Sequence, residues 1–446
     1  MTEPVVTIAI LSNQVINFEL LGEYIIRGSD EVFEGKFKAL YSQNTIDLEK
    51  PDGEISTKRE FVFDPIDEKT CAFVLYDVVV GRGFHWERKE SQRFLGSLKL
   101  CIENDGITAV NIIKAEEYLT SVISSEMRAT SNFEFMKAHS VISRSWLLSQ
   151  LEKKSRTMQY GFKTSELESK EDEIILWYDK KDHSLYDFCA DDHCQRYQGI
   201  SKGYTENALS AVAETNGIIL QSDGEVCDTR YSKCCGGVTE LYGNVWESRN
   251  FSYLKKIFDY KFDPDGYDLN LTNEKAAANW IRKKPPAFCN TTDRKILMQV
   301  LVNSDQKTRD FYRWRVEYSQ EEISAIIKEK TGFDFGNILD LVPVERGVSG
   351  RIIKLKILGS KKSLTYGKEL EIRRILSNSH LYSSAIVIDK FEIKNNIPSQ
   401  FVITGAGWGH GVGLCQIGAA MMSEMGYNFD EILLHYYRGA VLQKVY

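Results

Sequence analysis

The sequence predicts an α+β protein, in which a β-rich N-terminal domain (residues 1–105) precedes a mixed α+β unit (residues 106–446). Three observations favour this class. β-branched and aromatic runs broken by turn residues fill the chain up to about residue 113. The apolar period then changes to that of a helix at Ala115. A glycine-rich loop that leads into a helix lies near the end of the chain, at residues 405–426.

Composition narrows the classes of function. Of 446 residues, 43% are hydrophobic and 27% charged, the values of an ordinary folded protein. The net charge of -7 gives no general polyanion-binding surface, so nucleic acid is not an expected partner. The sequence has no apolar run of the ~18 to 20 residues that cross a membrane. Because no signal peptide is recognisable, the chain as written is expected in the cytoplasm; a location in the cell envelope is the alternative if its true start is missing.

Strands are expected throughout the first hundred residues. The runs that predict them are VVTIAIL, QVINFEL, EYIIRG, EFVFDP, CAFVLYDVVVG and FLGSLKLCI, the last of which is closed by the turn Asn104-Asp105-Gly106.

A helical hairpin is expected next. AEEYLTSVISSEM has helical spacing, and a second helix runs through FEFMKAHSVISRSWLLSQLEKK after a turn at residues 128–132. Glu126 closes the first helix on the face that carries Leu119, Val122 and Ile123. Because apolar surroundings raise the pKa of a carboxyl group towards the value that a general acid needs, Glu126 is a candidate catalytic acid. The alternative is a glutamate at a frayed helix end that reaches water.

The later elements follow from the same patterns. ENALSAVAETNGIIL predicts a short helix, a Gly217 stop and a strand, and SQEEISAIIKEKTG predicts a helix that ends at Gly332. RIIKLKILG and AIVIDKFEI alternate as strands do. Residues 251–310 have no clear period and are interpreted as an insertion.

A Cys/His cluster suggests a metal site. His183, Cys189, His193 and Cys194 lie within twelve residues, and zinc accepts two thiolates and two imidazoles tetrahedrally. Such a zinc would be structural, since four protein ligands leave no open position. The spacing is not that of a zinc finger, and buried free thiols are the alternative. No organic cofactor is expected.

Two glycine-containing segments are candidates for a binding site. In GAGWGHGVGLCQIGAAMMSEMG, glycines at alternate positions allow the backbone to approach a ligand or another strand, and Trp408 and His410 project between them. No G-x-G-x-x-G register fits, which argues against a dinucleotide loop. In YSKCCGGVTELYGNVWE, a turn at the paired glycines is followed by Thr239, Glu240 and Trp246, which either line a cleft or belong to an ordinary hairpin. A cysteine nucleophile paired with His410 has no local signature but stays open.

Taken together, these segments resemble the SpoIID/LytB family. Its patterns are matched, in family order over residues 106–446, by SEM at 125–127, MKAHSVISRS at 136–145, CQRYQG at 194–199, CGGVTE followed by VW at 235–246, and GWGHGVGLCQIGA at 407–419. Cys235 stands where the family usually has Ser, and His139 where it usually has Gln. The first ~105 residues lie outside the resemblance.

The resemblance implies a lytic transglycosylase that cuts peptidoglycan between N-acetylmuramic acid and N-acetylglucosamine, with Glu126 as the acid and base. The implied glycan-cleft residues are Arg144, Thr239, Glu240, Trp246, Trp408, His410 and Gln416. It also implies a structural zinc bound by His183, Cys189 and Cys194. His193 is the remaining candidate ligand, and the resemblance supports it less. The LytB branch suggests an alternative, a non-catalytic glycan-binding module that stimulates a cell-wall amidase partner. A third interpretation is a zinc hydrolase at the Cys/His cluster.

Overall fold

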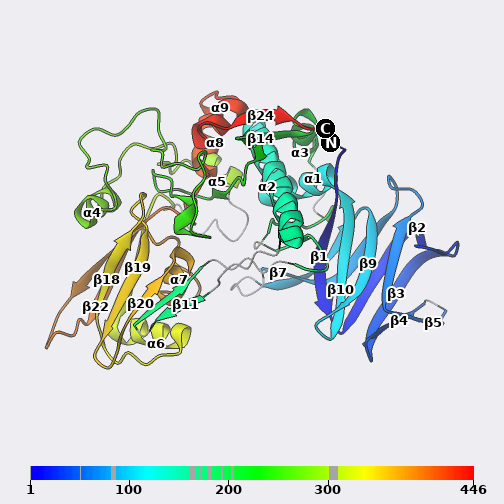
Figure 1. Ribbon diagram of the computed structural model, residues 1–446, viewed down its shortest axis with the longest axis horizontal. Helices are drawn as coiled ribbons and strands as arrows, with labels where there is room; N and C mark the ends of the chain where they lie inside the picture. The colour runs from blue at the N-terminus through cyan, green and yellow to red at the C-terminus, as the bar shows by residue number, and fades with distance from the viewer. Residues whose placement is uncertain are drawn as a thin grey trace.

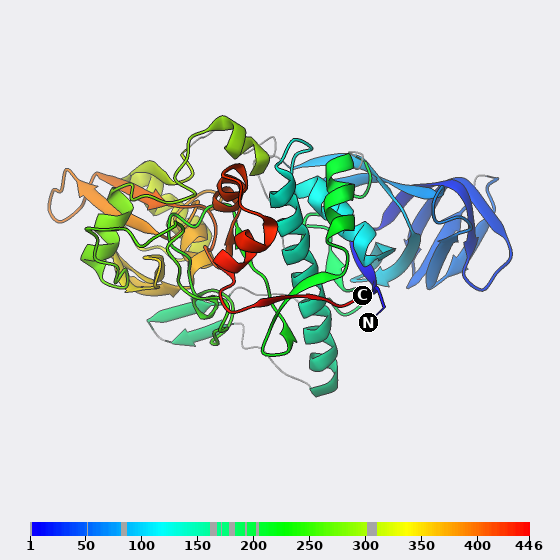
Figure 2. The same cartoon turned by 90° about the horizontal axis from the view of Figure 1, so that it is seen from above.

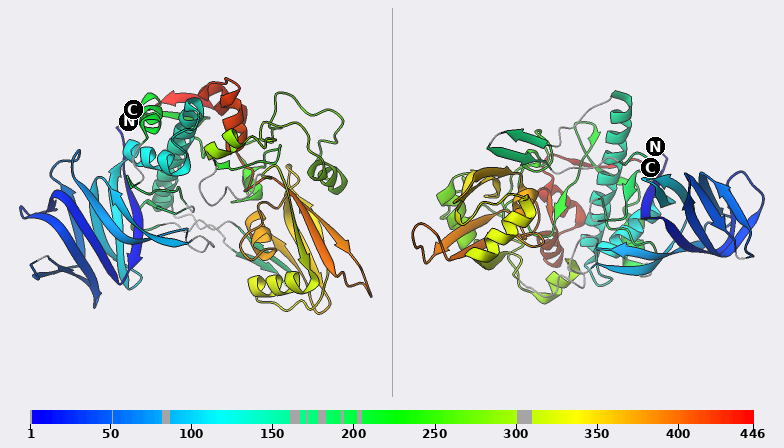
Figure 3. Two further views of the ribbon diagram at one scale, coloured as in Figure 1. Left: turned by 180° about the vertical axis from the view of Figure 1, so that it is seen from behind. Right: turned by 90° about the horizontal axis from the view of Figure 1, so that it is seen from below.

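The computed structural model describes residues 2–50, 52–81, 87–160, 167–170, 172–177, 183–191, 194–201, 205–300 and 310–446, with the side chains of residues 157–160 and 167–170 left out. Within these ranges the chain is mixed α+β, as its sequence predicts, with nine α-helices and several sheets. The large N-terminal sheet lies at one end of the molecule and the C-terminal sheets at the other, with helices between them (Figures 1 and 3). In the described part of the chain, no helix is both long and apolar enough to span a membrane.

The first ten strands and β13 (Phe188–Cys189) build the N-terminal sheet, whose path runs β13-β1-β10-β9-β6-β2-β3-β4-β5, while β7 pairs with β2 and β8 pairs with β7. The first ten are β1 (Val5–Asn13), β2 (Val15–Ile26), β3 (Val32–Ser42), β4 (Thr45–Glu49), β5 (Ile55–Lys58), β6 (Glu60–Pro65), β7 (Ala72–Val80), β8 (Arg88–Phe94), β9 (Ser97–Glu103) and β10 (Gly106–Lys114). Phe18, Phe37 and Phe63 pack against one another in its core.

Two local expectations for this sheet can be compared with the structure. The Asn104-Asp105-Gly106 turn joins β9 to β10 as predicted, and Asn104 and Asp105 adopt the positive φ that a tight hairpin requires. QVINFEL and EYIIRG, expected as two strands, form the single strand β2 instead. Gly22, with φ of 94°, lies at an irregularity in its pairing with β3, so this glycine bends the strand without ending it.

The sheet continues directly into the helical hairpin. Strand β10 ends at Lys114, and α1 (Ala115–Glu126) begins at the next residue, followed by α2 (Phe133–Tyr160). The apolar face of α1, including Leu119, Val122 and Ile123, belongs to the same hydrophobic cluster as the sheet. The boundary at residue 105 stays a prediction, but this cluster includes residues on both sides of it.

Around the hairpin lies a group of shorter elements with a second hydrophobic cluster. They are β13 (Phe188–Cys189), α3 (Glu206–Glu214), β14 (Ile218–Ser222), β15 (Glu225–Val226), β16 (Tyr231–Ser232), α5 (Arg294–Val300), β23 (Leu414–Cys415), α8 (Gln416–Glu424), α9 (Phe429–Tyr436) and β24 (Val441–Lys444). Helix α4 (Glu274–Arg282) lies away from the hairpin, against one of the C-terminal sheets. Figure 2 shows α8 and α9, in red, beside the long helix α2. Strand β16 pairs in parallel with β23, which joins the two glycine-containing segments.

The C-terminal end holds two further sheets around a third hydrophobic cluster. Their elements are β11 (Leu167–Lys170), β12 (Glu173–Leu176), β17 (Arg313–Ser319), α6 (Gln320–Thr331), β18 (Ile338–Arg346), β19 (Ile352–Gly359), β20 (Ser363–Gly367), α7 (Glu369–Ile375), β21 (Ile386–Phe391) and β22 (Gln400–Ala406). Helix α6 has the predicted start and stop, a capping box between Ser319 and Glu322 and a left-handed Gly332. Strand β12 pairs with β20, although β13, only a few residues later, pairs with β1 at the opposite end of the molecule.

Candidate functional site

A cavity of about 300 Å³ lies where the helical hairpin meets the two glycine-containing segments. Residues from distant parts of the sequence line it: Glu126, Trp146, Cys194, Gln195, Arg196, Thr229, Arg230, Tyr231, Ser232, Lys233, Trp246, Arg373, Trp408, Gly409, His410 and Gln416. The structure therefore brings together five of the site residues expected from the sequence, which are Glu126, Trp246, Trp408, His410 and Gln416.

Glu126 reaches the cavity from the last position of α1. Leu119, Val122 and Ile123 on the same helix are fully buried, whereas Glu126 is half-buried. The helix stops here because Met127 is extended, and its N–H donates to the carbonyl of Ile123. Among the residues that line the cavity, Glu126 is the one that supplies a carboxylate.

Aromatic side chains form another wall. Trp408 stacks on Phe311 with a centroid separation of 5.0 Å and also contacts Tyr382 at 4.5 Å. Trp246 meets the His410 ring edge to face, at 4.7 Å. Such rigid apolar surfaces beside polar groups suit a ligand that has both apolar faces and hydroxyl edges, as sugar rings do.

His410 is held as a neutral imidazole. Its Nδ1 accepts a hydrogen bond of 3.0 Å from the Val412 N–H, so that nitrogen carries no proton. Burial holds the pKa of His410 well below its usual range, and the cationic Arg230, Arg351 and Arg373 lower it further. A histidine in this state shapes the wall of the cavity and is a poor proton donor.

The wall of the cavity is rich in positive charge. Four cationic residues line the cavity, Arg196, Arg230, Lys233 and Arg373. Arg230 forms an ion pair of 2.7 Å with Asp228, and its guanidinium lies 4.5 Å from the centre of the Trp246 ring. The excess of cations over carboxylates favours a ligand that carries a negative group.

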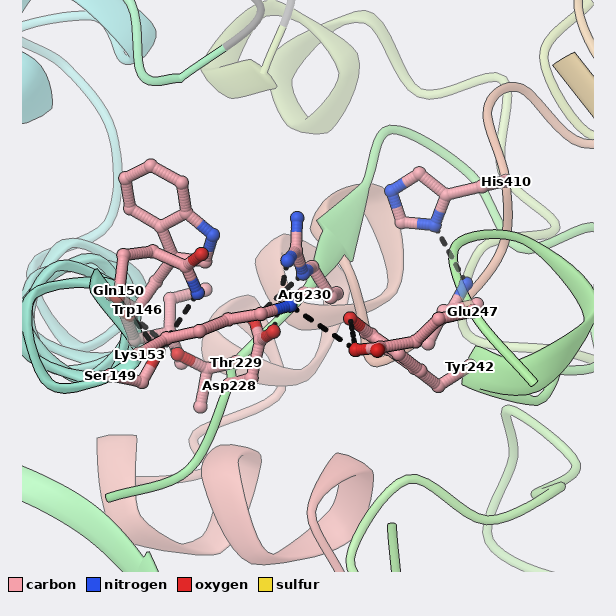
Figure 4. A network of polar contacts seen from close by, with 12 residues as sticks. Trp146, Ser149, Gln150, Lys153, Asp228, Thr229, Arg230, Tyr242, Glu247 and His410 are labelled. Carbon is pink, nitrogen blue, oxygen red and sulfur yellow. Dashed lines mark hydrogen bonds and ion pairs between the residues drawn. The ribbon is translucent and has the colours of Figure 1, made fainter. Parts of the chain in front are cut away.

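A polar network fixes one side of the cavity (Figure 4). Figure 4 shows Trp146, Ser149, Gln150 and Lys153 of α2 on one side, Arg230 in the middle, and Tyr242, Glu247 and His410 on the other. Glu247 connects the two sides because its carboxylate pairs with Lys153 Nζ at 3.2 Å and accepts a hydrogen bond of 3.0 Å from the Tyr242 hydroxyl. Glu247 therefore links the long helix α2 to the Trp246 segment.

Gln416, the first residue of α8, is oriented by a histidine of α2. Its Nε2 lies 2.9 Å from Nε2 of His139. His139 is fully buried, and burial lowers its pKa to about 3, so the neutral ring can accept the amide hydrogen. His139 occupies the position where the resemblance leads one to expect Gln.

The alternate glycines serve a close approach of backbone to backbone. The Cys234 N–H donates to the Trp408 carbonyl at 3.0 Å, and the Trp408 N–H donates to the Cys234 carbonyl at 2.8 Å. Gly411 has a φ of 77°, and a Cβ there would collide with the Arg351 guanidinium. The sequence left open whether these glycines let the backbone approach a ligand or another strand. The structure shows the approach to another strand, and this approach fixes Trp408 and His410 in the cavity wall.

Arg144 does not line the cavity. It is fully buried and pairs bidentately with Glu116 of α1, at 2.7 Å for each contact, while its third nitrogen donates to the Ile218 carbonyl at 3.0 Å. Tyr446 also donates to Glu116 at 2.6 Å. The structure thus places Arg144 as a residue that ties the two helices of the hairpin together, and not in the expected glycan cleft.

Thr239 and Glu240 also lie away from the cavity. Both are 1% exposed. The Thr239 hydroxyl donates to the Lys255 carbonyl and accepts from the Ile257 N–H, each at 2.9 Å. The Glu240 carboxylate accepts hydrogen bonds from the amides of Leu241, Val348 and Ser349, the Ser349 hydroxyl and the Asn244 side chain. These contacts hold loops in place, which differs from the expected contact with a sugar.

Three members of the Cys/His cluster lie beside the cavity. The ligand atoms of His183, Cys189 and Cys194 are all within 4.8 Å of one another, and Cys194 Sγ is 3.7 Å from His183 Nε2. His193 lies outside the described residues. Cys189 belongs to β13, which pairs with β1, so the N-terminal sheet carries one end of this loop. Two thiols and an imidazole at these separations fit zinc, which binds such donors at about 2.0 to 2.3 Å.

Sequence reasoning missed several residues of the cavity. Trp146, Arg230 and Arg373 line it, but none belongs to the segments that the sequence singled out as the glycan site. Trp146 follows directly after the motif MKAHSVISRS, and its apolar spacing in the sequence indicates only a core residue. In the structure it is 3% exposed. Arg230 and Arg373 carry no local signal that separates them from surface arginines.

Comparison with known proteins matches two parts of the chain to family models. Residues 103–221 match the family model of the stage II sporulation protein SpoIID, and residues 240–413 match a domain of unknown function, DUF8618. The SpoIID match contains Glu126, the second helix motif and CQRYQG. The remaining two motifs lie outside it.

Curated relatives point in the same direction. The chain is 25% identical over 260 residues to the amidase enhancer of Bacillus subtilis (strain 168). The aligned region is 56% of this chain and 34% of that protein. It is 22% identical to the stage II sporulation protein D of Bacillus amyloliquefaciens, over 74% of each chain. The stage II sporulation protein D of Bacillus subtilis (strain 168) is 23% identical over 75% of this chain and 76% of that one. Together with the matched domain, these relatives support the assignment of the chain to the SpoIID family.

Proposed function

We propose that the protein cleaves peptidoglycan glycan strands by a lytic transglycosylase mechanism, with Glu126 as general acid and base. Its similarity to the amidase enhancer and to the stage II sporulation proteins D supports a role connected with the cell wall. The observation that carries the finer proposal is the cavity itself, because Glu126 faces the same space as Trp246, Trp408 and His410.

A single carboxyl group is sufficient for this reaction. Protonated Glu126 gives its proton to the glycosidic oxygen as the bond to C1 of the muramoyl residue breaks. The resulting carboxylate takes the proton of the C6 hydroxyl as that oxygen closes on C1, which yields a 1,6-anhydro sugar and restores the acid. A two-carboxylate hydrolase needs a partner at about 5 to 10 Å. Glu240, the candidate partner, accepts five hydrogen bonds from its own loops and does not line the cavity.

The charge of the cavity suits the muramoyl side of the bond. A muramic acid residue freed of its stem peptide carries a lactyl carboxylate, and Arg196, Arg230, Lys233 and Arg373 supply cations around the Glu126 carboxyl. Trp408 and Trp246 offer apolar faces to the sugar rings. The neutral His410 leaves the acid role to Glu126.

The test is a comparison of products from peptide-stripped peptidoglycan. The wild type should release fragments with 1,6-anhydro ends, detected by mass spectrometry, and Glu126→Gln should lower the yield by about 100-fold or more, because acid–base catalysis contributes 10²- to 10⁴-fold. Glu117→Gln, on the same helix but outside this cavity, is the matched control and should leave the yield unchanged. Equal yields from the wild type and Glu126→Gln would disprove the assignment.

A second function is favoured by the relative called amidase enhancer. On this proposal the chain binds glycan strands and stimulates a cell-wall amidase without breaking a bond. The same variants separate the two functions. An enhancer would release no anhydro ends alone, and Glu126→Gln would stimulate the amidase as well as the wild type.

The metal loop has a structural role in this proposal. His183, Cys189 and Cys194 would hold a zinc ion, a compact cation that here cross-links a loop of the chain. Because Cys194, Gln195 and Arg196 all line the cavity, ordering the loop also orders that wall. Tyr118 of α1 donates a hydrogen bond of 3.2 Å to Gln195, which seats the following residues against the hairpin that carries Glu126.

A further inference from the structure

A second group of metal-binding side chains lies in the buried core, away from the Cys/His cluster. It consists of Cys235, Asp259, Cys289 and Cys415, whose ligand atoms all lie within 4.8 Å of one another. All four residues are buried, with exposures between 0% and 2%. They come from four separate segments of the chain, so only the folded protein brings them together. We propose that these four residues form a buried tetrahedral zinc site of three thiolates and one carboxylate.

The separations fit one ion. With Zn–S bonds of about 2.3 Å, two sulfurs at tetrahedral positions lie about 3.7 Å apart, and a sulfur and a carboxylate oxygen about 3.5 Å apart. Cys235 Sγ is 3.6 Å from Cys289 Sγ and 3.3 Å from Asp259 Oδ2. A bond between two sulfurs would require about 2.05 Å, so these thiols lie at the spacing of joint ligands and not of a disulfide.

The surroundings supply what bound thiolates require. The Cys235 N–H points at Cys415 Sγ at 3.2 Å, and the Gly237 N–H points at Cys235 Sγ at 3.4 Å. Amide hydrogens directed at sulfur stabilise negative charge there. The other oxygen of Asp259 accepts a hydrogen bond of 2.7 Å from Tyr436, which turns Oδ2 towards the sulfurs. Such second contacts orient metal ligands.

Asp259 provides an independent reason for a cation. A fully buried carboxylate is costly unless it is paired or coordinates a metal. Its carboxylate contacts the Tyr436 hydroxyl, His435 at 3.7 Å and the Cys235 thiol. None of these is a permanent cation, whereas a divalent ion would neutralise the carboxylate directly. The soft thiolates select zinc over magnesium or calcium.

The position of the site indicates what it does. Cys235 and Cys415 belong to the two glycine-containing segments, while Asp259 and Cys289 belong to the stretch that has no clear period in the sequence. That stretch meets the first segment through backbone hydrogen bonds, such as that from the Asp259 N–H to the Gly237 carbonyl. A zinc ion here would fasten it to the loop that carries Trp408 and His410. With four protein ligands the site has no open position and is structural.

The test is the metal content of the full chain, purified under reducing conditions without chelator and measured by inductively coupled plasma mass spectrometry. Cys289→Ser and Asp259→Asn should each contain one zinc fewer per chain than the wild type. Cys227→Ser, a buried thiol outside the group, is the matched control and should lose none. Unchanged zinc content in both site variants would overturn the proposal.

Cys234 tests the ligand set, because its thiol is also buried and neighbours Cys289 and Cys415. Cys234→Ser should keep the zinc that Asp259→Asn loses, and the reverse result would overturn the assignment of the carboxylate. X-ray absorption of the wild type requires no variant to fold. The Cys/His cluster offers two described thiols and the buried site offers three. An average of more than two sulfur neighbours per zinc ion would therefore support the buried site. An average of two or fewer would refute it.

Discussion

His139 of α2 and Gln416 of α8 face each other across the core, with their Nε2 atoms 2.9 Å apart. The imidazole acts as the acceptor, since the amide nitrogen can only donate. His139 thus fixes which way the Gln416 side chain points, although His139 itself does not line the cavity. One buried histidine therefore orients a residue of the candidate site.

This contact predicts a pH dependence of stability. Burial lowers the pKa of His139 from 6.5 to about 3, so between these values the unfolded chain binds a proton that the folded chain does not. The stabilisation is complete above pH 6.5 and is lost as the pH falls, by up to about 1.4 kcal/mol per pH unit. Relative to His139→Gln, the wild type should lose about 2 kcal/mol between pH 6.5 and pH 5. Urea denaturation of both proteins measures this, and parallel curves would contradict it.

The buried Arg144–Glu116 pair predicts a large loss of stability on truncation. Arg144→Met leaves the Glu116 carboxylate without its main partner inside the protein and should lower the free energy of unfolding by about 3 to 5 kcal/mol. The control is Arg27→Met, which removes an equally short but exposed pair with Asp64 and should cost about 1 kcal/mol or less. Similar losses from the two variants would show that Arg144 is not an anchor.

Glu240→Gln tests whether Glu240 is an anchor or a second catalytic carboxylate. The substitution replaces one carboxylate oxygen by an NH₂ group, which faces hydrogen-bond donors and cannot accept from them. The free energy of unfolding should therefore fall by about 1 to 3 kcal/mol. The release of anhydro ends, measured well below the melting temperature, should persist. A folded Glu240→Gln protein as inactive as Glu126→Gln would contradict the one-carboxylate mechanism.

A structural zinc at the Cys/His cluster predicts that loss of a ligand destabilises the fold. Cys189→Ser should lower the melting temperature, because a zinc ion bound at this cluster would cross-link the loop that carries the Gln195 wall of the cavity. Thermal melting curves of the wild type and Cys189→Ser, followed by circular dichroism, give the measurement. If activity disappears while the melting curve stays unchanged, the metal is catalytic, which would favour a zinc hydrolase.

Gly411→Ala, compared with Gly439→Ala, separates the cost of a steric clash with Arg351 from the cost of a positive φ for alanine. The new Cβ meets the Arg351 guanidinium, which donates to the Gly409 and Cys235 carbonyls, and it also forces alanine into a φ of 77°. Gly439→Ala has a φ of 92° but open space around its Cβ, so it carries only the backbone cost of about 1 to 2 kcal/mol. Thermal melting should show a larger loss for Gly411→Ala. Equal losses would mean that Arg351 moves aside freely.

The sequence predicted best where the determinants of structure are local. Helix α1 follows from its apolar spacing, α6 from Ser319 and Gly332, and the β9–β10 turn from Asn104-Asp105-Gly106. Strand β3 gives no clear β-rich run in the sequence, because Glu34, Lys36 and Lys38 occupy exposed positions along it. Residues 251–310 could not be interpreted because tertiary contacts, such as the Asp259 amide with the Gly237 carbonyl, fix their path.

The candidate site shows the same limit. Glu126, Trp408 and His410 could be named because short motifs carry them, and they do converge on one cavity. Arg144, Thr239 and Glu240 sit in motifs that are just as distinctive, yet their partners Glu116, Lys255 and Ser349 decide where they point. A motif therefore identifies a residue of interest without telling whether it faces a ligand or a neighbouring loop.

The route of the chain between β12 and β13 limits how the molecule can deform. Strand β12 is part of the C-terminal sheet through β20, and β13 is part of the N-terminal sheet through β1. The covalent link between them runs from Leu176 to Phe188, and a chain of that length reaches at most about 40 Å when fully extended. The segment is a tether between the two ends of the molecule. While both strands stay paired, this maximum length sets the upper limit on the distance between the end of β12 and the start of β13.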